Sequence, residues 1–384
     1  MRILKVAGIT NSRNSGMGRV MHSTADEMRL MGHTVDMLFS EDVPRFRRGA
    51  SDRFVFPVAL VKAIRAAIRE RGQYDVVEIH EPSAAWYCHV RRYDKSLPPC
   101  VVMSHGSEQN YWNHLVNLDL CLGRRTSLKR RISVSLTLLS QVKYSLQHCQ
   151  QVMCLNSQDE DFFRTKSHIS SIKLSRIQHG VESHFFQSKQ TVPNTQPRLL
   201  FVGSWLDNKG RTVIPKVFER LYKQYPGLQM SLLGTGLSVP AVLDSFDLAL
   251  QPAITVHPRV NDNELLAAYA EHDIMVLPSF FESWGLVLLE AAAAQVAIVS
   301  STAGGPSELF RDGENAFLVP ALDIQAITAA ISKLIDDPQL RFQLGRKAQE
   351  RARQFTWSAA AQSQLNAYEC AMENANVNLN EARS

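Results

Sequence analysis

The stretch DIMVLPSFFESWGLVLLEAAAAQVAIVSS, residues 273–301, contains the pattern that decides the fold. DIMVLP and VAIVSS are short apolar runs, which are typical of strands buried on both faces of a sheet. Between them, LVLLEAAAA consists almost entirely of strong helix formers, so we expect a buried helix over residues 286–294. A strand, a helix and a second strand in succession predict a βαβ unit on a parallel sheet.

Two acids in this stretch need an explanation. Glu290 lies inside the apolar helical run, where a carboxylate is costly to desolvate unless something pairs with it. Either Glu290 points out through a gap in the packing, or it faces a polar ligand. Glu282 lies just before the turn at Gly285, where the free N–H groups of the helix that follows favour an anion.

The same alternation of short apolar runs and helical patterns continues along the whole chain. We expect further strands at residues 3–9, 34–39, 75–80, 100–105, 151–156, 198–203, 229–234, 254–258 and 316–320. This predicts an α/β protein with two Rossmann-like, doubly wound domains facing a cleft. Ligands of such sheets bind beyond the carboxyl ends of the strands, so candidate site residues are sought there.

The domain boundaries follow from chain length and from one aperiodic segment. At 384 residues the chain is too long for one ordinary core. Residues 187–197, QSKQTVPNTQP, lack periodicity and contain two prolines, which predicts a linker. We therefore expect an N-terminal acceptor-side domain over 1–186 and a donor-binding domain over 198–357. For the final helix, 358–384, one option is that it crosses back to the N-terminal domain.

Composition indicates an ordinary globular protein, with 45% hydrophobic and 21% charged residues. No apolar run approaches the roughly 18 residues of a membrane span, and MRILKVAGIT fits a first strand better than a signal peptide. The six cysteines form no CxxC pair and show no zinc spacing, so we expect reduced thiols and a cytoplasmic location.

A glycine-rich loop, NSRNSGMGRVMHS, follows the first strand. Gly16 and Gly18 would let the backbone approach a ligand, the helix N-terminus would favour an anion, and Arg19 could add a positive charge. The dinucleotide fingerprint is incomplete because Met21 occupies its third glycine position, and the loop has no Walker lysine. A plain strand–helix turn explains this loop almost as well.

Polar groups close three further strands of the first half. His105, followed by a glycine, is the better candidate for function, whereas His80 fits a structural role. The acids of residues 159–161, DED, have the D-x-D pattern of some metal-dependent sugar-nucleotide enzymes. We interpret them as a helix start instead, with Ser157 and Glu160 forming a capping box, and we expect no metal site.

Strand ends of the second half also carry suitable groups for a ligand with phosphates and hydroxyls. Lys209 and Arg211 follow the strand at 198–203, and an ammonium beside a glycine suits a phosphate. Gly304 and Gly305 follow another strand and would allow close approach of a ligand. Carboxylates such as Glu290 would accept hydrogen bonds from sugar or ribose hydroxyls. A nucleotide sugar fits this combination.

With these residues in view, the chain resembles the family 4 glycosyltransferases of the GT-B fold. The resemblance is carried by PSFFESWGLVLLEAAAA, STAGGPSELFRDGENAFLVP and the closing FTW, which together resemble the family's C-terminal domain. Glu282 and Glu290 match the acids of its E-x7-E motif. The GMG loop, the SHG at His105 and IQHGVESHFF extend the resemblance over nearly the whole chain.

The resemblance implies roles for individual residues. Glu290 would bind the donor ribose, Glu282 the hydroxyls of the donor sugar, and Lys209 the diphosphate. His105 would contact the transferred sugar from the other domain. The diphosphate and the rest of the donor would also meet Gly285, Leu286, Val287, Ser204, Arg211, Gly304 and Gly305. The family retains anomeric configuration and generally needs no metal or other cofactor.

The chain departs from the family pattern at one functional position. An Arg that also binds the diphosphate often stands where Ser204 stands here. The expected function is retaining transfer of a hexose from a nucleotide diphosphate sugar to an acceptor hydroxyl. A binding protein that holds a nucleotide sugar without turnover is the alternative, and the E-x7-E context argues against a nucleotide-sugar epimerase.

Charge is distributed unevenly along the chain. Residues 1–190 carry 27 Lys and Arg against 17 Asp and Glu, whereas residues 191–384 carry 15 against 20. An N-terminal half of net charge +10 suggests an anionic partner. We expect peripheral contact with the inner face of an anionic membrane and no nucleic-acid partner. The basic residues concerned are Lys62, Arg65, Arg69, Arg124, Arg125, Lys129, Arg130 and Arg131.

Overall fold

The computed structural model describes residues 1–13, 15–44, 52–186 and 196–381. It divides into two compact units, and the chain enters one of them twice. The first unit comprises Met1–His179 and Trp357–Ser384, and the second comprises Gly180–Thr356. Residues 180–186, which we had assigned to the N-terminal domain, thus belong to the second unit. Most of the predicted linker lies outside the described residues.

The first unit is built on a six-stranded parallel sheet with the order β2-β1-β3-β4-β5-β6. Five strands confirm the predicted ones, while β6 was not predicted because it is short, polar and at the sheet edge. The strands are β1 (Arg2–Val6), β2 (Thr34–Leu38), β3 (Val76–His80), β4 (Cys100–Met103), β5 (Gln151–Cys154) and β6 (Leu174–Arg176).

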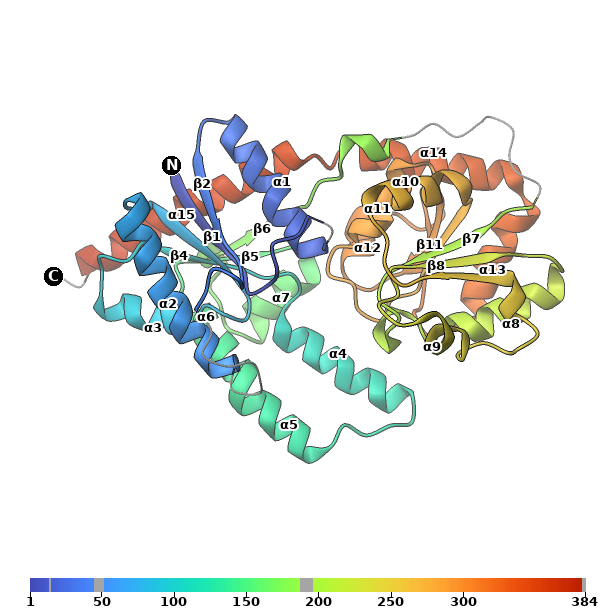
Figure 1. Ribbon diagram of the computed structural model, residues 1–384, viewed down its shortest axis with the longest axis horizontal. Helices are drawn as coiled ribbons and strands as arrows, with labels where there is room; N and C mark the ends of the chain where they lie inside the picture. Colours follow the sequence, from blue (N-terminus) through green and yellow to red (C-terminus); the bar gives the residue numbers. More distant parts are fainter. Residues whose placement is uncertain (14, 45–51, 187–195, 382–384) are drawn as a thin grey trace. The chain divides into compact units, whose positions relative to one another are not determined.

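Helices cover both faces of this sheet because side chains alternate along each strand. Leu4 and Val6 of β1 join a core formed with α2, α3 and α6, while α1 and α15 pack against each other. Figure 1 shows α15, the last helix, lying among the elements of the first unit. The helices are α1 (Gly16–Leu30), α2 (Asp52–Arg71), α3 (Ala85–Tyr93), α4 (Glu108–Cys121), α5 (Leu128–Val134), the π-helix η1 (Ser135–Leu139), α6 (Ser140–His148), α7 (Ser157–Thr165), η2 (Ser171–Lys173) and α15 (Trp357–Glu381).

The second unit repeats the architecture, with the strand order β12-β11-β10-β7-β8-β9 and all pairs parallel. The predicted strands are confirmed here, and the expected helix at 286–294 is α11. The strands are β7 (Leu199–Val202), β8 (Met230–Leu233), β9 (Ile254–His257), β10 (Ile274–Leu277), β11 (Ala297–Ser301) and β12 (Phe317–Val319).

The helices of the second unit bury mainly apolar faces against its sheet and one another. They are η3 (Ser183–Phe185), η4 (Asp207–Lys209), α8 (Ile214–Gln224), α9 (Val239–Leu243), η5 (Gln251–Ala253), α10 (Asp262–Glu271), α11 (Leu286–Ala293), α12 (Gly305–Leu309), α13 (Ile324–Asp336) and α14 (Pro338–Ala352). In the part of the chain that the structure describes, no helix is both long and apolar enough to cross a bilayer.

One predicted helix start is wrong. The side chain of Asn156, not that of Ser157, caps α7 by accepting a hydrogen bond from the backbone N–H of Asp159 at 2.8 Å. Ser157 is already the first helical residue, so the predicted capping box with Glu160 does not form. Asn lies among the best N-cap residues, and the extended backbone at Asn156 is the conformation that a cap requires.

Candidate active site

Strand order singles out one point in each sheet. In the second unit the chain runs outward from β7 through β8 to β9 and then returns to add β10 on the other side of β7. In the first unit the corresponding point lies between β1 and β3. Neighbouring loops diverge at such topological switch points and leave room for a ligand at the carboxyl ends of the strands.

Two predicted site residues meet at the switch point of the second unit. Lys209 follows β7 and Glu282 follows β10, and the ammonium Nζ lies 2.7 Å from the carboxylate Oε2. Ser279 Oγ donates to the same oxygen at 3.3 Å. The Lys209 and Glu282 side chains are 25% and 13% exposed, so the pair remains accessible to a ligand. Sequence reasoning had predicted both residues but not this ion pair.

The α11 helix starts beside this pair. Gly285 has φ of 93°, a left-handed conformation, and serves as the N-cap without any side-chain hydrogen bond. The backbone N–H groups of Leu286 and Val287, the first two of the helix, have no intrahelical acceptor, whereas those of Leu288 and Leu289 donate to the carbonyl of Gly285. Such a helix start favours a negatively charged group.

Glu290 lies one turn further along α11 and is 3% exposed. Tyr269 Oη, which also donates to the carbonyl of Val287, lies 3.1 Å from a Glu290 carboxylate oxygen. The carboxylate thus stays inside the packing beside a hydroxyl group. Of the two readings of Glu290, an outward-pointing side chain is excluded, and its predicted contact with ribose stays a prediction.

The loop after β11 is held close to the Glu282 loop. The backbone N–H of Gly305 donates to the carbonyl of Glu282 at 2.8 Å. A Cβ atom on Gly305 would lie 2.3 Å from backbone atoms of Trp284, so only glycine fits there. Gly304 precedes it with φ of 65° and caps α12. These two glycines are thus required for the packing of one loop on another.

The remaining predicted residues of the second unit lie at its rim. Ser204, at the position where the family often has Arg, is exposed after β7. Trp205 beside it is fully buried and donates from Nε1 to Ser245 Oγ at 3.1 Å. Arg211 is exposed two residues beyond Lys209. Arg211 therefore supplies a second cation close to Lys209 in the sequence, whereas position 204 supplies none.

In the glycine-rich loop of the first unit, Gly18 is required by the packing of the loop itself. Ser15 caps α1 by accepting from the backbone N–H of Gly18 at 3.1 Å. A Cβ atom on Gly18 would lie 1.9 Å from the carbonyl oxygen of Ser12, so the chain already fills that space. Gly16 is exposed, and Arg19 is 9% exposed. The predicted ligand contacts of this loop stay predictions.

His105 ends a row of hydrogen-bonded side chains. Its Nε2 lies 2.8 Å from Nδ1 of His80, and Nε2 of His80 lies 2.8 Å from the Glu78 carboxylate. Because a carboxylate only accepts, His80 donates from Nε2 to Glu78. The other ring nitrogen of His80, Nδ1, makes the hydrogen bond with Nε2 of His105. Burial, with His80, His179 and Lys5 nearby, lowers the pKa of His105 well below 6.5.

Glu78 belongs to a buried polar network that sequence reasoning missed. Parallel pairing sets it beside Lys5, with Nζ and Oε1 3.4 Å apart and both side chains almost completely buried. Lys5 Nζ also donates to Thr24 at 2.6 Å and to Gln364 at 2.9 Å, and Tyr368 donates to Glu78 at 2.5 Å. The network therefore connects His105 to the C-terminal helix. In the sequence, this network is indicated by one charged residue inside each of two apolar strands, Lys5 in β1 and Glu78 in β3.

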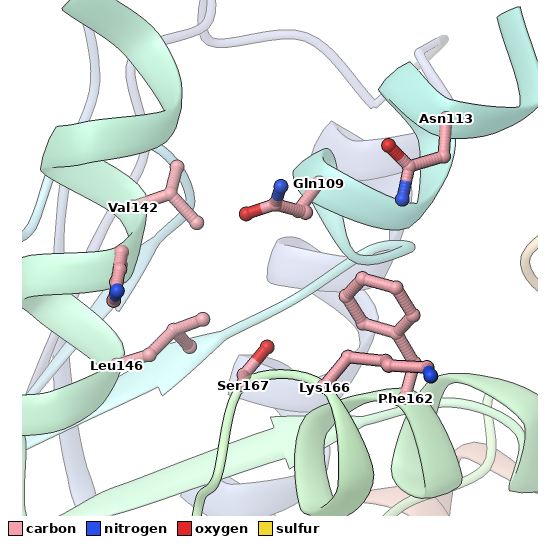
Figure 2. Close-up of a pocket in the computed structure, with 8 residues that line it drawn as sticks. Gln109, Asn113, Val142, Leu146, Phe162, Lys166 and Ser167 are labelled. Carbon is pink, nitrogen blue, oxygen red and sulfur yellow. The ribbon is translucent and has the colours of Figure 1, made fainter. Parts of the chain in front are cut away.

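Two further clusters bear on metals and anions. Asp159 accepts from Asn110 at 3.0 Å and from Asn156 at 2.9 Å, and no group of three or more His, Cys, Asp or Glu in the described segments could hold a metal ion. The first unit also has a groove with a volume of about 320 Å³. Figure 2 shows its lining residues Val142 and Leu146 on α6, Gln109 and Asn113 on α4, and Phe162 and Lys166 at α7. Lys143 and Ser167 complete its lining.

Two family models match consecutive parts of the chain. The model described as Glycosyltransferase Family 4 matches residues 14–185, and the model described as Glycosyl transferases group 1 matches residues 183–351. The chain therefore belongs to the family 4-like glycosyltransferases with the GT-B fold.

Individual relatives agree with this assignment. The chain is 34% identical over 188 residues to a D-inositol 3-phosphate glycosyltransferase of Arthrobacter sp. (strain FB24), a match that covers 47% of this chain and 44% of that protein. The chain thus matches less than half the length of that curated relative.

Among solved structures, a sucrose-phosphate synthase from Thermosynechococcus elongatus superposes with a TM-score of 0.76 at 18% identity, covering 96% of this chain and 98% of the other. The catalytic domain of Starch Synthase IV from Arabidopsis thaliana, bound to ADP and acarbose, has a TM-score of 0.72 at 13% identity, with 97% and 99% covered. At these identities the superpositions show the fold.

Proposed function

We propose that this protein transfers a hexose from a nucleotide diphosphate sugar to an acceptor hydroxyl with retention of anomeric configuration. The observation that carries the proposal is the accessible Lys209–Glu282 pair at the switch point of the second sheet, beside the start of α11. Family membership supports the same reaction class.

In this proposal the second unit holds the donor. Lys209 and the first N–H groups of α11 bind the diphosphate without a metal, and Arg211 assists from the rim. Glu282 orients Lys209 through the 2.7 Å contact and accepts from hydroxyls of the donor sugar. Glu290 accepts from the ribose. Lys209 matters most as the sugar leaves, because charge grows on the diphosphate while that bond breaks.

The reaction exchanges one bond to the anomeric carbon for another. The bond to the diphosphate oxygen breaks with its electron pair, and the acceptor oxygen bonds to the same carbon. The acceptor proton passes to the departing diphosphate. His105, kept neutral by burial and oriented through His80, contacts the transferred sugar as an uncharged hydrogen-bonding group.

Calorimetric titration of UDP, ADP and GDP into the full-length protein tests donor binding. Glu290→Gln should weaken binding of the best nucleotide about 10- to 150-fold, since charge-assisted hydrogen bonds contribute about 1.5–3 kcal/mol. Tyr269→Phe is the matched control because it removes the same Tyr269–Glu290 contact. Equal effects of both substitutions would mean that Glu290 serves only to accept from Tyr269. If no nucleotide binds, the proposal is wrong.

Turnover separates a transferase from a protein that only binds nucleotide sugars. The parent protein should release nucleoside diphosphate from the matching nucleotide sugar, to acceptor or to water, and EDTA should not abolish that release. Binding without release under any condition would instead indicate a binding protein, with Ser204 as the responsible departure.

We also propose that the first unit contacts an anionic membrane. Leu128, Ile132 and Leu136 lie four residues apart along α5 and η1 and are 71%, 50% and 71% exposed. Residues at this spacing share one face of a helix. Figure 1 shows α4 and α5 extending together from the first unit. The exposed basic residues beside this stripe are Arg124, Arg125, Lys129, Arg130 and Arg131.

Vesicle sedimentation tests this contact. Each basic residue near an anionic surface contributes about 1 kcal/mol, and salt screens it, so binding to vesicles with phosphatidylglycerol should exceed binding to neutral vesicles and fall at high salt. Serine at Leu128, Ile132 and Leu136 together should reduce binding. Leu248→Ser, at an 81% exposed leucine of the second unit, is the control. No binding at low salt would refute the contact.

A further inference from the structure

A cavity lies at the switch point of the first sheet. It follows the carboxyl ends of β1 and β3, has a volume of about 420 Å³, and is closed on one side by η1 and α6. Its volume lies within the range of sites that hold small molecules. Its lining includes Gly8, Met17, Glu81, Glu108, Leu138 and Gln141. Met17 stands between the two glycines of the loop after β1.

The carboxyl group of Glu81 has an unmet hydrogen-bonding capacity at this cavity. Its Oε2 accepts from Ser104 Oγ at 2.6 Å. Its Oε1 is buried and has no hydrogen-bond partner among the described residues. A buried polar atom without a partner is costly unless a ligand or water completes it. The cavity therefore has one site where a hydroxyl group can bond.

The electrostatic surroundings restrict what that group can be. Burial, together with the negative charges of Glu108 and Asp159, raises the pKa of Glu81 to about 8. Glu108 lines the cavity itself, and no lysine or arginine does so among the described residues. A phosphate would enter a negative field with no cation to pair with it, which is unfavourable at close range.

We propose that this cavity receives the acceptor and that the acceptor group bound there is an uncharged, hydroxyl-bearing glycosyl or polyol unit without a phosphate. The proposal rests on the transferase function proposed above and specifies its acceptor class. Apolar walls suit the C–H faces of a sugar ring, and Glu81 Oε1 bonds to one of its hydroxyls.

The lysine-rimmed groove of Figure 2 provides an internal contrast. Lys143 and Lys166 line it, whereas the cavity at Glu81 contains acids. A phosphorylated compound that binds the first unit is expected in the groove. A binding experiment with a phosphorylated compound must therefore distinguish the groove from the cavity at Glu81. Substituting Lys143 and Lys166 makes this distinction, because these lysines line the groove and not the cavity.

Saturation-transfer NMR on the full-length protein tests the proposal. The uncharged probes are methyl α-D-glucopyranoside, methyl α-D-mannopyranoside and myo-inositol, and the charged probes are glucose 6-phosphate and myo-inositol 1-phosphate. At least one uncharged probe should bind. Its affinity should fall at least tenfold in Leu138→Trp, which fills the cavity, and should be unchanged in Lys143→Ala/Lys166→Ala. In Gln141→Arg a phosphorylated probe should gain affinity.

Two results would overturn the proposal. One is that no uncharged probe binds at millimolar concentration. The other is that a phosphorylated probe binds more tightly, survives the loss of both lysines and is displaced by Leu138→Trp. Probe binding is measured without nucleotide and without turnover. A failure of the nucleotide titrations, which would contradict the proposed function, can therefore be told apart from a failure of the proposed acceptor class. Nucleotide binding to Leu138→Trp, measured in parallel, shows that the second unit of this variant is folded.

Discussion

Replacing Glu78 with glutamine should destabilise the first unit strongly. The Glu78 carboxylate is buried, and although burial alone would raise its pKa, Lys5, His80 and Tyr368 together lower it to about 2. A carboxyl group in the unfolded chain titrates near 4.5, so the difference of about 2.5 units corresponds to about 3 kcal/mol at neutral pH. Breaking a buried ion pair typically costs a similar 3–5 kcal/mol.

The sign of the pH dependence follows from the lowered pKa. The contribution of Glu78 is fully present above about pH 4.5 and is lost as pH falls toward 2. The stability difference between the parent protein and Glu78→Gln should therefore shrink on acidification. Burial also lowers the pKa of Lys5. In the variant, loss of the Lys5 proton at alkaline pH should relieve part of the damage.

Amide hydrogen exchange followed by mass spectrometry is the suitable assay, because it reports on β1 and β3 without assuming that both units unfold together. Exchange of their protected amides should accelerate about 100-fold at pH 7. Glu70→Gln, at an exposed carboxylate of α2, is the control and should change little. Adding Lys5→Met to Glu78→Gln should restore much of the protection. Two results would refute this expectation. One is a free energy of unfolding for Glu78→Gln within about 1 kcal/mol of the parent value, and the other is a Lys5→Met/Glu78→Gln protein that is less stable than Glu78→Gln alone.

Three other substitutions give separate tests. Gly305→Ala should destabilise the second unit and lower its urea midpoint, because its Cβ would lie 2.3 Å from the Trp284 backbone; an unchanged midpoint would contradict that packing. Lys209→Met should lower kcat for donor turnover about 10²- to 10³-fold, whereas Lys216→Met, at an exposed residue of α8, should not. Glu81→Gln should gain stability relative to the parent as pH rises from about 4.5 through 8, because the raised pKa makes ionisation of the buried acid unfavourable; a constant difference in urea midpoint would count against it.

Local pattern was sufficient for most of the architecture, for physical reasons visible in single elements. Strands buried on both faces, such as β4 and β10, are continuous apolar runs. The edge strand β6, LSR, lacks such a run and was not predicted. The boundary between units was misplaced because residues 180–186 contact the second unit, and contacts of that kind leave no periodic signal.

The candidate site was predictable residue by residue but not as an arrangement. Lys209 and Glu282 were each suggested by a strand end, yet their 2.7 Å contact depends on β7 and β10 being neighbours. Lys5 and Glu78 were visible as isolated charges, but the register that pairs them is a property of the sheet. Tyr368 is 290 residues from Glu78 in sequence, so nothing local could connect them.

The return of α15 to the first unit has a consequence for the order of events during synthesis. The first 179 residues leave the ribosome long before residues 357–381, which supply Tyr368 and Gln364 to Glu78 and Lys5. At about 5–20 residues per second, the intervening segment takes roughly ten seconds or more to translate. During that interval the nascent first unit has buried charges without their final partners, and at its end the second unit is already complete. The unit that is translated first is therefore the one that finishes folding last.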